Sequence, residues 1–291
     1  MIVKEYYLGQ YEKSMPNDMS LRKKLALSKE TGFDYMELSV DETDEKLGRI
    51  YLGGKELKEM KSIIDGESQP IRSICLSAHR KYPLGSEDEK TVQKSLDISK
   101  RAVEFAAFMG IRNIQLAGYD VYYESSSEKT RERFLKNLKK TAEFAASFGV
   151  GLGFETMETP FMNTAEKAMK YVNAVNSPYL NVYPDIGNIR NAAEDVVKDL
   201  KTAKGHIIAA HLKETKEGLF RDVPFGTGRT PYVPCIRELI DQNVRMFVLE
   251  FWYDKKSDPK RYVKEGFDYI TEKFEEALKD SRQLDSLTAD D

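Results

Sequence analysis

RMFVLEFW, at residues 245–252, places an acidic residue near the end of a run of large apolar side chains. VGLGFET (150–156) and HIIAAHLK (206–213) repeat the arrangement, with Glu155 and His211 close to the end of each run. Short runs that are rich in β-branched and aromatic residues and bounded by turn residues are typical of strands. These segments therefore predict strands that each carry a chemically active residue at the carboxyl end.

Runs of this kind alternate with long amphipathic segments along the whole chain. The predicted strands are centred near Leu8, Met36, Cys75, Gln115, Phe154, Tyr183, Ala210 and Leu249. The clearest helix begins at Ser86, with Glu89 in a capping-box pattern, and stops at Gly110. Apolar stripes predict further helices over 20–31, 55–64, 134–148, 164–175, 191–203, 231–242 and 259–278.

Eight strands alternating with helices predict an α/β protein with a parallel sheet, and at 291 residues a closed (β/α)₈ TIM barrel is favoured. An open, doubly wound sheet is the second choice, because no glycine-rich phosphate loop follows the first strand. We expect one catalytic domain over residues 1–279. Residues 280–291 have no apolar face and predict a disordered tail.

The composition is that of an ordinary globular protein, with 41% hydrophobic and 32% charged residues and a net charge of −3. Mixed charge of this kind predicts neither a nucleic-acid nor a membrane partner. Cys75 and Cys235 have no metal-ligand or redox spacing, and the amino terminus lacks a signal-peptide pattern. We therefore expect a cytoplasmic protein with reduced thiols.

A barrel of this type carries its active site at the carboxyl ends of the strands. The polar residues that the predicted strands place there are Glu37, Ser77, His79, Gln115, Glu155, Glu158, Asp185, Asn188, His211, Lys213 and Glu250. Four consecutive strands, the fifth to the eighth, each contribute one metal-type ligand to this set. They are Glu155, Asp185, His211 and Glu250.

Charged residues inside apolar strands are costly unless they are paired or bind a metal. One such glutamate would more often be a buried, hydrogen-bonded residue, but four in register favour a metal site. Three carboxylates and one imidazole suit one divalent metal ion, Mn²⁺, Zn²⁺, Co²⁺ or Mg²⁺. Such an ion would acidify the carbon between a sugar carbonyl and its neighbouring hydroxyl. Glu155 and Glu250, from the fifth and eighth strands, would then be the acid–base pair of an epimerisation.

At these residues the chain resembles the sugar-phosphate isomerase/epimerase superfamily with the xylose-isomerase-like barrel, and within it the L-ribulose-5-phosphate 3-epimerases. The segments that carry the resemblance are LGQYEKSMP (8–16), MELSVDETDEKLGRI (36–50), CLSAHRKYPLGSEDE (75–89), IQLAGYDVYY (114–123), YPDIGN (183–188), HIIAAHLKETK (206–216) and VPFGTG (223–228). The resemblance implies interconversion of L-xylulose 5-phosphate and L-ribulose 5-phosphate in L-ascorbate catabolism. It places the metal ligands on the same four residues. Because similar barrels are commonly dimers, it also predicts a homodimer.

The remaining barrel-top residues are expected to bind substrate. They are Glu37, Ser77, His79, Gln115, Glu158, Asn188, Lys213 and Arg221. Related epimerases of unphosphorylated ketoses usually have His where this chain has Asn188, which favours a phosphorylated or otherwise different substrate. Lys213, Arg221, His79 with Arg80, and the backbone of the Gly226–Gly228 turn are rival phosphate contacts.

Other functions remain open from the residues alone. An aldose–ketose isomerase of a sugar phosphate, or a 3-epimerase of an unphosphorylated ketose, would use the same ligands. A metal-dependent DNA-repair endonuclease shares this barrel but needs many histidines, and this chain has three. A non-catalytic sugar-sensing barrel is disfavoured because all four ligand positions are intact.

Overall fold

Eight parallel strands form the centre of the protein in a computed structural model, which describes residues 4–288 and the side chains up to residue 279. The strands are β1 Tyr7–Tyr11, β2 Tyr35–Val40, β3 Ile71–Leu76, β4 Asn113–Ala117, β5 Gly151–Glu155, β6 Leu180–Tyr183, β7 Ala210–Leu212 and β8 Met246–Leu249. Their order is β6-β5-β4-β3-β2-β1-β8-β7. Isolated bridges join Val182 to Ile207 and Asp185 to His211, so the sheet is a nearly closed barrel and the predicted fold class is confirmed.

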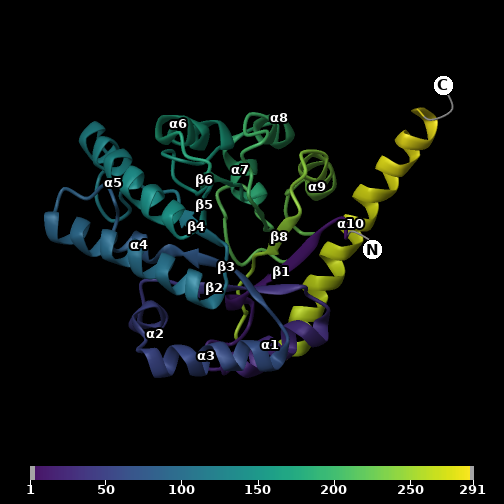
Figure 1. Cartoon of the computed structure of the whole chain (residues 1–291). Coiled ribbons are helices and arrows are strands. Elements are labelled where there is room, and N and C mark those ends of the chain that lie inside the picture. Colours follow the sequence, from purple (N-terminus) through teal and green to yellow (C-terminus); the bar gives the residue numbers. More distant parts are fainter. Residues whose placement is uncertain (1–3, 289–291) are drawn as a thin grey trace.

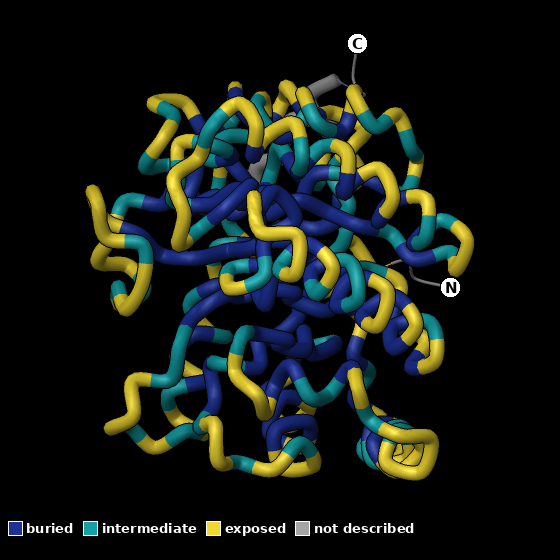
Figure 2. The backbone as a smooth tube through the Cα atoms, turned by 90° about the vertical axis from the view of Figure 1, so that its left-hand side faces the viewer, coloured by how far each residue is buried: buried dark blue, intermediate teal, exposed yellow. Residues whose placement is uncertain are grey.

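Helices surround the strands (Figure 1). They are α1 Leu21–Thr31, α2 Asp44–Gly48, α3 Gly54–Glu67, α4 Glu89–Met109, α5 Glu128–Ser147, α6 Ala165–Val175, α7 Ile186–Ala192, α8 Val196–Lys201, α9 Tyr232–Asp241 and α10 Pro259–Thr288. Short 3₁₀ helices lie at η1 Glu12–Ser14, η2 Arg49–Tyr51 and η3 Ser77–Arg80. Burial follows this arrangement, since the strands at the centre are buried and the exposed segments lie outside them (Figure 2).

The core forms where the apolar stripes of the helices meet the outer faces of the strands. Phe134 and Leu138 of α5 are buried in one cluster with Phe154 of β5, as the spacing in the sequence predicts. Gly110 ends α4 with a left-handed backbone, φ 77°, which is the predicted role of this glycine. Within the described residues, no helix has the length and apolar character needed to cross a bilayer.

Two helix predictions need correction. The cap of α4 is Asp88, whose side chain accepts a hydrogen bond from the Thr91 N–H, whereas the buried Ser86 donates to Glu124. The helix expected over 191–203 is divided into α7 and α8, because Ala193 is extended and Asp195 caps a new helix. The disordered tail expected over 280–291 differs from the structure, in which the helix α10 continues through Thr288; residues 289–291 lie outside the described part.

Candidate metal centre

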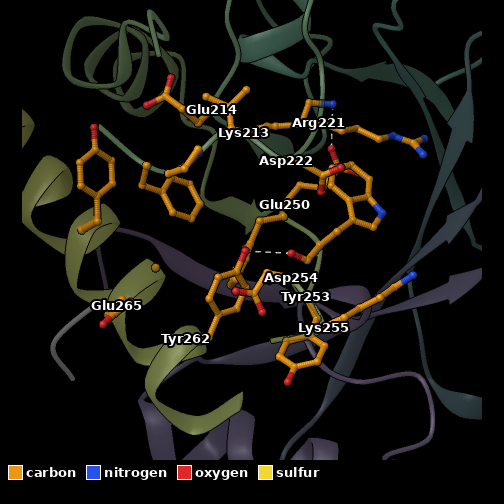
Figure 3. Close-up of a pocket in the computed structure, with 17 residues that line it drawn as sticks. Lys213, Glu214, Arg221, Asp222, Glu250, Tyr253, Asp254, Lys255, Tyr262 and Glu265 are labelled. Atoms are coloured by element: carbon orange, nitrogen blue, oxygen red, sulfur yellow. Dashed lines mark hydrogen bonds and ion pairs between the residues drawn. The ribbon is translucent and has the colours of Figure 1, made fainter. Parts of the chain in front are cut away.

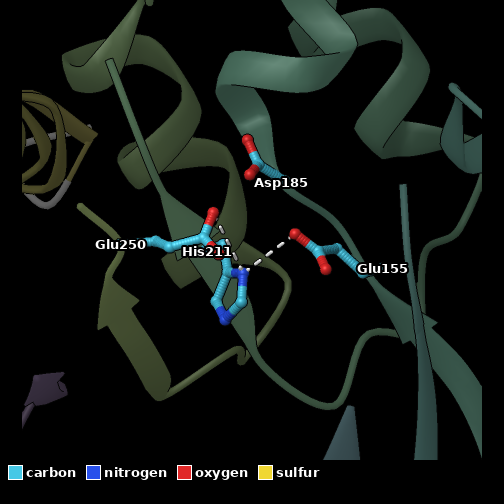
Figure 4. A group of neighbouring side chains, drawn as sticks. All are labelled: Glu155, Asp185, His211 and Glu250. Atoms are coloured by element: carbon cyan, nitrogen blue, oxygen red, sulfur yellow. Dashed lines mark hydrogen bonds and ion pairs between the residues drawn. The ribbon is translucent and has the colours of Figure 1, made fainter. Parts of the chain in front are cut away.

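Four side chains meet at the carboxyl ends of β5 to β8 (Figure 4). Glu155 ends β5, Asp185 follows β6, His211 lies within β7 and Glu250 follows β8. One ligand atom from each lies within 4.8 Å of the others, and all four residues are buried. The bridge between Asp185 and His211 is the seam of the barrel, so closing the sheet is what completes the cluster.

The His211 ring has one nitrogen facing the cluster and one facing away from it. Its Nδ1 lies 3.2 Å from Glu155 Oε1 and 3.7 Å from Glu250 Oε2, and the two glutamates lie on opposite sides of the imidazole in Figure 4. Its Nε2 lies 2.7 Å from Glu37 Oε1. The nitrogen available to a metal is therefore Nδ1.

The donor set fits a divalent cation. Within the described residues, Asp185 Oδ2 and Glu250 Oε2 are buried without a hydrogen bond, although the Lys213 ammonium lies 2.6 Å and 3.0 Å from them. Lys213 is thus the cation that both oxygens already face, and a metal is indicated by the charge and the chemistry of the donor set. Three carboxylates against one ammonium leave an excess of negative charge that a divalent ion would neutralise. The cluster could thus hold a metal ion.

Burial and neighbouring charges push the two glutamates in opposite directions. Burial, followed by the charge of Glu250, raises the pKa of Glu155 above its usual value. Burial would also raise the pKa of Glu250, but the cations Lys213 and His211 outweigh it and lower this pKa to about 2. Burial raises the pKa of Asp185 to about 7.

A small cavity of about 40 Å³ lies against the cluster. Of the four candidate ligands, Glu155 and Glu250 line this cavity, whereas Asp185 and His211 do not. The other residues expected to bind substrate that line it are Ser77, Glu158, Asn188, Lys213 and Arg221. Asn188 Oδ1 is a buried acceptor with no described partner, which suits the hydroxyl group of a bound sugar.

Three residues expected to bind substrate lie behind the cavity wall. Gln115 donates a hydrogen bond to Glu155 Oε2, and Glu37 contacts His211. His79 faces α4, with its Nε2 3.3 Å from the Ser95 carbonyl oxygen, and burial lowers its pKa to about 4. All three are buried and none lines the cavity. Their positions therefore do not support the prediction that they contact the substrate.

The sequence analysis did not select several residues of the cavity wall. They are Tyr11, Lys13, Cys75, Arg80, Met157, Phe220 and Trp252, of which Arg80 was considered only as a rival phosphate contact. Tyr11 ends β1, so its position at a carboxyl strand end was a usable signal. Phe220 had no such signal, because it lies in a loop between β7 and α9 whose course the sequence pattern does not determine.

The Gly226–Gly228 turn, which was expected to bind the substrate phosphate, binds the Glu214 carboxylate of this chain instead. Gly226 N–H donates to Glu214 Oε2 at 3.0 Å, and Thr230 N–H donates to Glu214 Oε1 at 3.1 Å. The Gly226–Gly228 turn is therefore removed from the candidate phosphate contacts. It anchors the loop after β7 instead.

A larger pocket of about 620 Å³ lies beside the cavity (Figure 3). Lys213, Arg221, Glu250 and Trp252 line both spaces, so they form the partition between them. The Arg221 guanidinium lies 4.7 Å from the centre of the Trp252 ring, a cation–π distance. Lys213 points toward Glu250 in Figure 3, in agreement with their ion pair.

The sequence model of the xylose isomerase-like TIM barrel family matches residues 25–273, and the chain belongs to this family. Within it, the chain is 39% identical over 278 residues to a putative L-ribulose-5-phosphate 3-epimerase, UlaE, of Shigella dysenteriae, covering 95% of this chain and 98% of the relative. It is 40% identical over 271 residues to L-ribulose-5-phosphate 3-epimerase UlaE of Salmonella heidelberg, covering 93% and 95%.

Solved structures of similar fold are much more distant in sequence. An L-ribulose 3-epimerase superposes with a TM-score of 0.79 at 16% identity, covering 96% of this chain and 98% of the other. The zinc-bound IolI protein superposes with a TM-score of 0.75 at 17% identity, covering 92% and 97%. At this identity the two structures support the fold alone.

Proposed function

We propose that this protein is a metal-dependent 3-epimerase that interconverts L-xylulose 5-phosphate and L-ribulose 5-phosphate. The observation that carries the proposal is that the two glutamates of the cluster, from β5 and β8, line the cavity. Relatives 39% and 40% identical over nearly the whole chain bear the name L-ribulose-5-phosphate 3-epimerase. The metal would be Mn²⁺, Zn²⁺, Co²⁺ or Mg²⁺, held by Glu155, Asp185, His211 and Glu250.

A bound divalent ion would stabilise negative charge on the two oxygens of the enediolate. The proton transfers belong to the two glutamates. One of them, as the carboxylate, removes the C3 proton of one epimer as the C3–H bond breaks. The other, in its protonated form, returns a proton to the opposite face of C3, and the roles reverse for the other epimer. Gln115 holds Glu155 through Oε2, and Lys213 neutralises part of the carboxylate charge.

Proton exchange in D₂O tests this function directly. The metal-loaded protein, incubated with L-xylulose 5-phosphate, is expected to produce L-ribulose 5-phosphate and to incorporate deuterium at C3, as followed by NMR. Chelation should stop both, and added Mn²⁺ or Zn²⁺ should restore them. Exchange at C1 would instead indicate an aldose–ketose isomerase. Reaction of free ketoses alone would indicate a 3-epimerase of unphosphorylated sugars.

The phosphate is proposed to lie near Arg221. The inner cavity is far smaller than the roughly 300 Å³ of the smallest ordinary ligand pockets, so a pentulose phosphate must reach beyond it. Arg221 stands on the wall shared with the larger pocket, where its guanidinium lies over the Trp252 ring. Lys213 is less suitable, because its ammonium already neutralises Asp185 and Glu250.

Arg221→Ala is expected to raise KM for L-ribulose 5-phosphate by about tenfold or more, since a charge-assisted hydrogen bond contributes about 1.5–3 kcal/mol. The KM for unphosphorylated L-ribulose should change much less. Steady-state kinetics with both sugars measure this difference, and Lys255→Ala, in the wall of the outer pocket, is the matched control. An equal rise in KM for both sugars would show that Arg221 contacts the sugar and not the phosphate.

The cytoplasmic location, the homodimer and the place in L-ascorbate catabolism stay predictions. Size-exclusion chromatography with light scattering of the full chain measures the oligomeric state.

A further inference from the structure

Glu37 is a fully buried acid whose two oxygens are both engaged inside the barrel. Its Oε1 lies 2.7 Å from His211 Nε2. Its Oε2 accepts hydrogen bonds from Ser73 Oγ and from the Tyr183 hydroxyl, each at 2.8 Å. These partners come from β7, β3 and β6, so one carboxylate on β2 ties three other strands of the barrel together.

The backbone of β2 is adapted to this contact. The pairing of β2 with β3 shifts register between Met36 and Glu37, so that Glu37 stands opposite Ser73. Irregular pairing of this kind re-aims side chains and often occurs next to active sites. The Tyr183 ring also packs edge-on against the His211 ring, at 4.9 Å between centroids. Both the hydrogen bond and the ring contact therefore fix the orientation of the imidazole.

We propose that Glu37 is a positioning residue, which holds His211 as the Nε2–H tautomer so that the Nδ1 lone pair faces the metal. The inference rests on the proposed metal site and adds a residue that does not touch the ion. A histidine that binds a metal through one nitrogen commonly donates its other N–H to a carboxylate, which fixes the tautomer and raises the basicity of the ligand. The distances here have this form, with Nε2 on Glu37 and Nδ1 beside Glu155 and Glu250.

This role explains why the position carries a carboxylate. The Glu37 side chain faces three groups that can each donate a hydrogen bond. They are the His211 ring, the Ser73 hydroxyl and the Tyr183 hydroxyl. A carboxylate accepts through both oxygens, whereas an amide would present one NH₂ group to the same neighbours. A role in binding substrate fits less well, because Glu37 does not line the cavity.

Metal affinity in the absence of substrate tests the proposal. Glu37→Gln keeps the size of the side chain and is expected to weaken Co²⁺ and Mn²⁺ binding by about 10- to 100-fold, the usual effect of losing such a partner. The full-length protein would be titrated against a chelator of known affinity. The Co²⁺ absorption bands should also shift, because they report the ligand field and not the activity.

Tyr183→Phe is the second variant, because it removes one donor to Glu37 and leaves the ligands intact. It should weaken metal binding by a smaller factor than Glu37→Gln. Tyr35→Phe is the matched control: it deletes another buried barrel hydroxyl, which donates to the Phe247 carbonyl oxygen at 2.9 Å, and should leave the metal Kd unchanged.

The outcomes separate this inference from the proposed function. Wild-type metal affinity and an unshifted Co²⁺ spectrum in both folded Glu37→Gln and Tyr183→Phe would overturn the inference and leave the metal site standing. If Glu37→Gln does not fold, Tyr183→Phe alone decides, because its loss of affinity is compared with Tyr35→Phe. Wild-type protein that binds no divalent ion would overturn the metal site and the inference together. A raised substrate KM with an unchanged metal Kd would assign Glu37 to the substrate instead.

Discussion

Glu155→Gln and Glu250→Gln are each expected to lower the rate of epimerisation by about a thousandfold or more, because each change removes a proton-transfer group and a ligand charge together. The two carboxylates differ from Asp185 and His211 in lining the cavity, which places them where a substrate carbon would lie. The rate of conversion between L-xylulose 5-phosphate and L-ribulose 5-phosphate, measured with saturating metal, checks this expectation.

Proton exchange distinguishes the two roles further. With one base left, each variant should still exchange the C3 proton of one epimer slowly in D₂O, and the favoured epimer should differ between the variants. Glu265→Gln, an exposed acid in the wall of the outer pocket, is the control and should keep wild-type rates. Epimerisation by Glu155→Gln or Glu250→Gln at more than a few per cent of the wild-type rate would refute the acid–base assignment.

Glu12→Gln is expected to lower the free energy of unfolding by about 3–5 kcal/mol, the usual cost of breaking a buried ion pair from one side. Glu12 is fully buried and its Oε1 lies 3.0 Å from Lys24 Nζ, 3.2 Å from Lys46 Nζ and 2.8 Å from Arg49 Nη2. Without the carboxylate, these cations would repel one another in a site with little water. Urea denaturation of the metal-free protein measures the loss.

The pH dependence of this effect follows from the same contacts. Burial by itself would raise the pKa of Glu12, but Arg49, Lys24 and Lys46 together hold it well below its usual range. A lowered pKa in the folded state means that the stabilisation is present above the unfolded pKa of about 4.3 and is lost as the pH falls toward the folded value. The difference between wild type and Glu12→Gln should therefore be largest near neutral pH and narrow below about pH 4.

A surface pair provides the control for Glu12. Glu59 lies 3.9 Å from Lys55, and both side chains are mostly exposed. Glu59→Gln should change the free energy of unfolding by less than about 1 kcal/mol, as is usual for exposed pairs. If Glu12→Gln were as mild as Glu59→Gln, the buried network would not contribute to stability.

The order of strands and helices could be predicted from the sequence because it depends on local patterns. The apolar run RMFVLEFW predicts a strand, and its Met246–Leu249 part forms β8; the apolar stripe through Phe134 and Leu138 predicts a helix packed against the core, and this helix is α5. A parallel barrel then brings the carboxyl ends of all strands to one side. For that reason, Glu155 and Glu250 could be expected in one cluster before the structure was known.

Other features depend on contacts between distant segments. Lys46 belongs to the charged stretch DETDEK at 41–46, yet its side chain is buried against Glu12. Glu214 occupies the glycine turn that was a candidate for phosphate. Neither contact has a local pattern, because the partners are brought together by the packing of loops from different strands.

The sequence by itself thus determined the barrel and the identity of four candidate ligands, since periodicity and strand ends are local properties of the chain. Only the tertiary structure decided how the ligands are held. Glu37 and His211 are 174 residues apart, and the hydrogen bond between them exists because β2 and β7 project side chains into the same barrel interior. Which nitrogen of His211 faces the cluster is set by that bond, and no spacing along the chain encodes it.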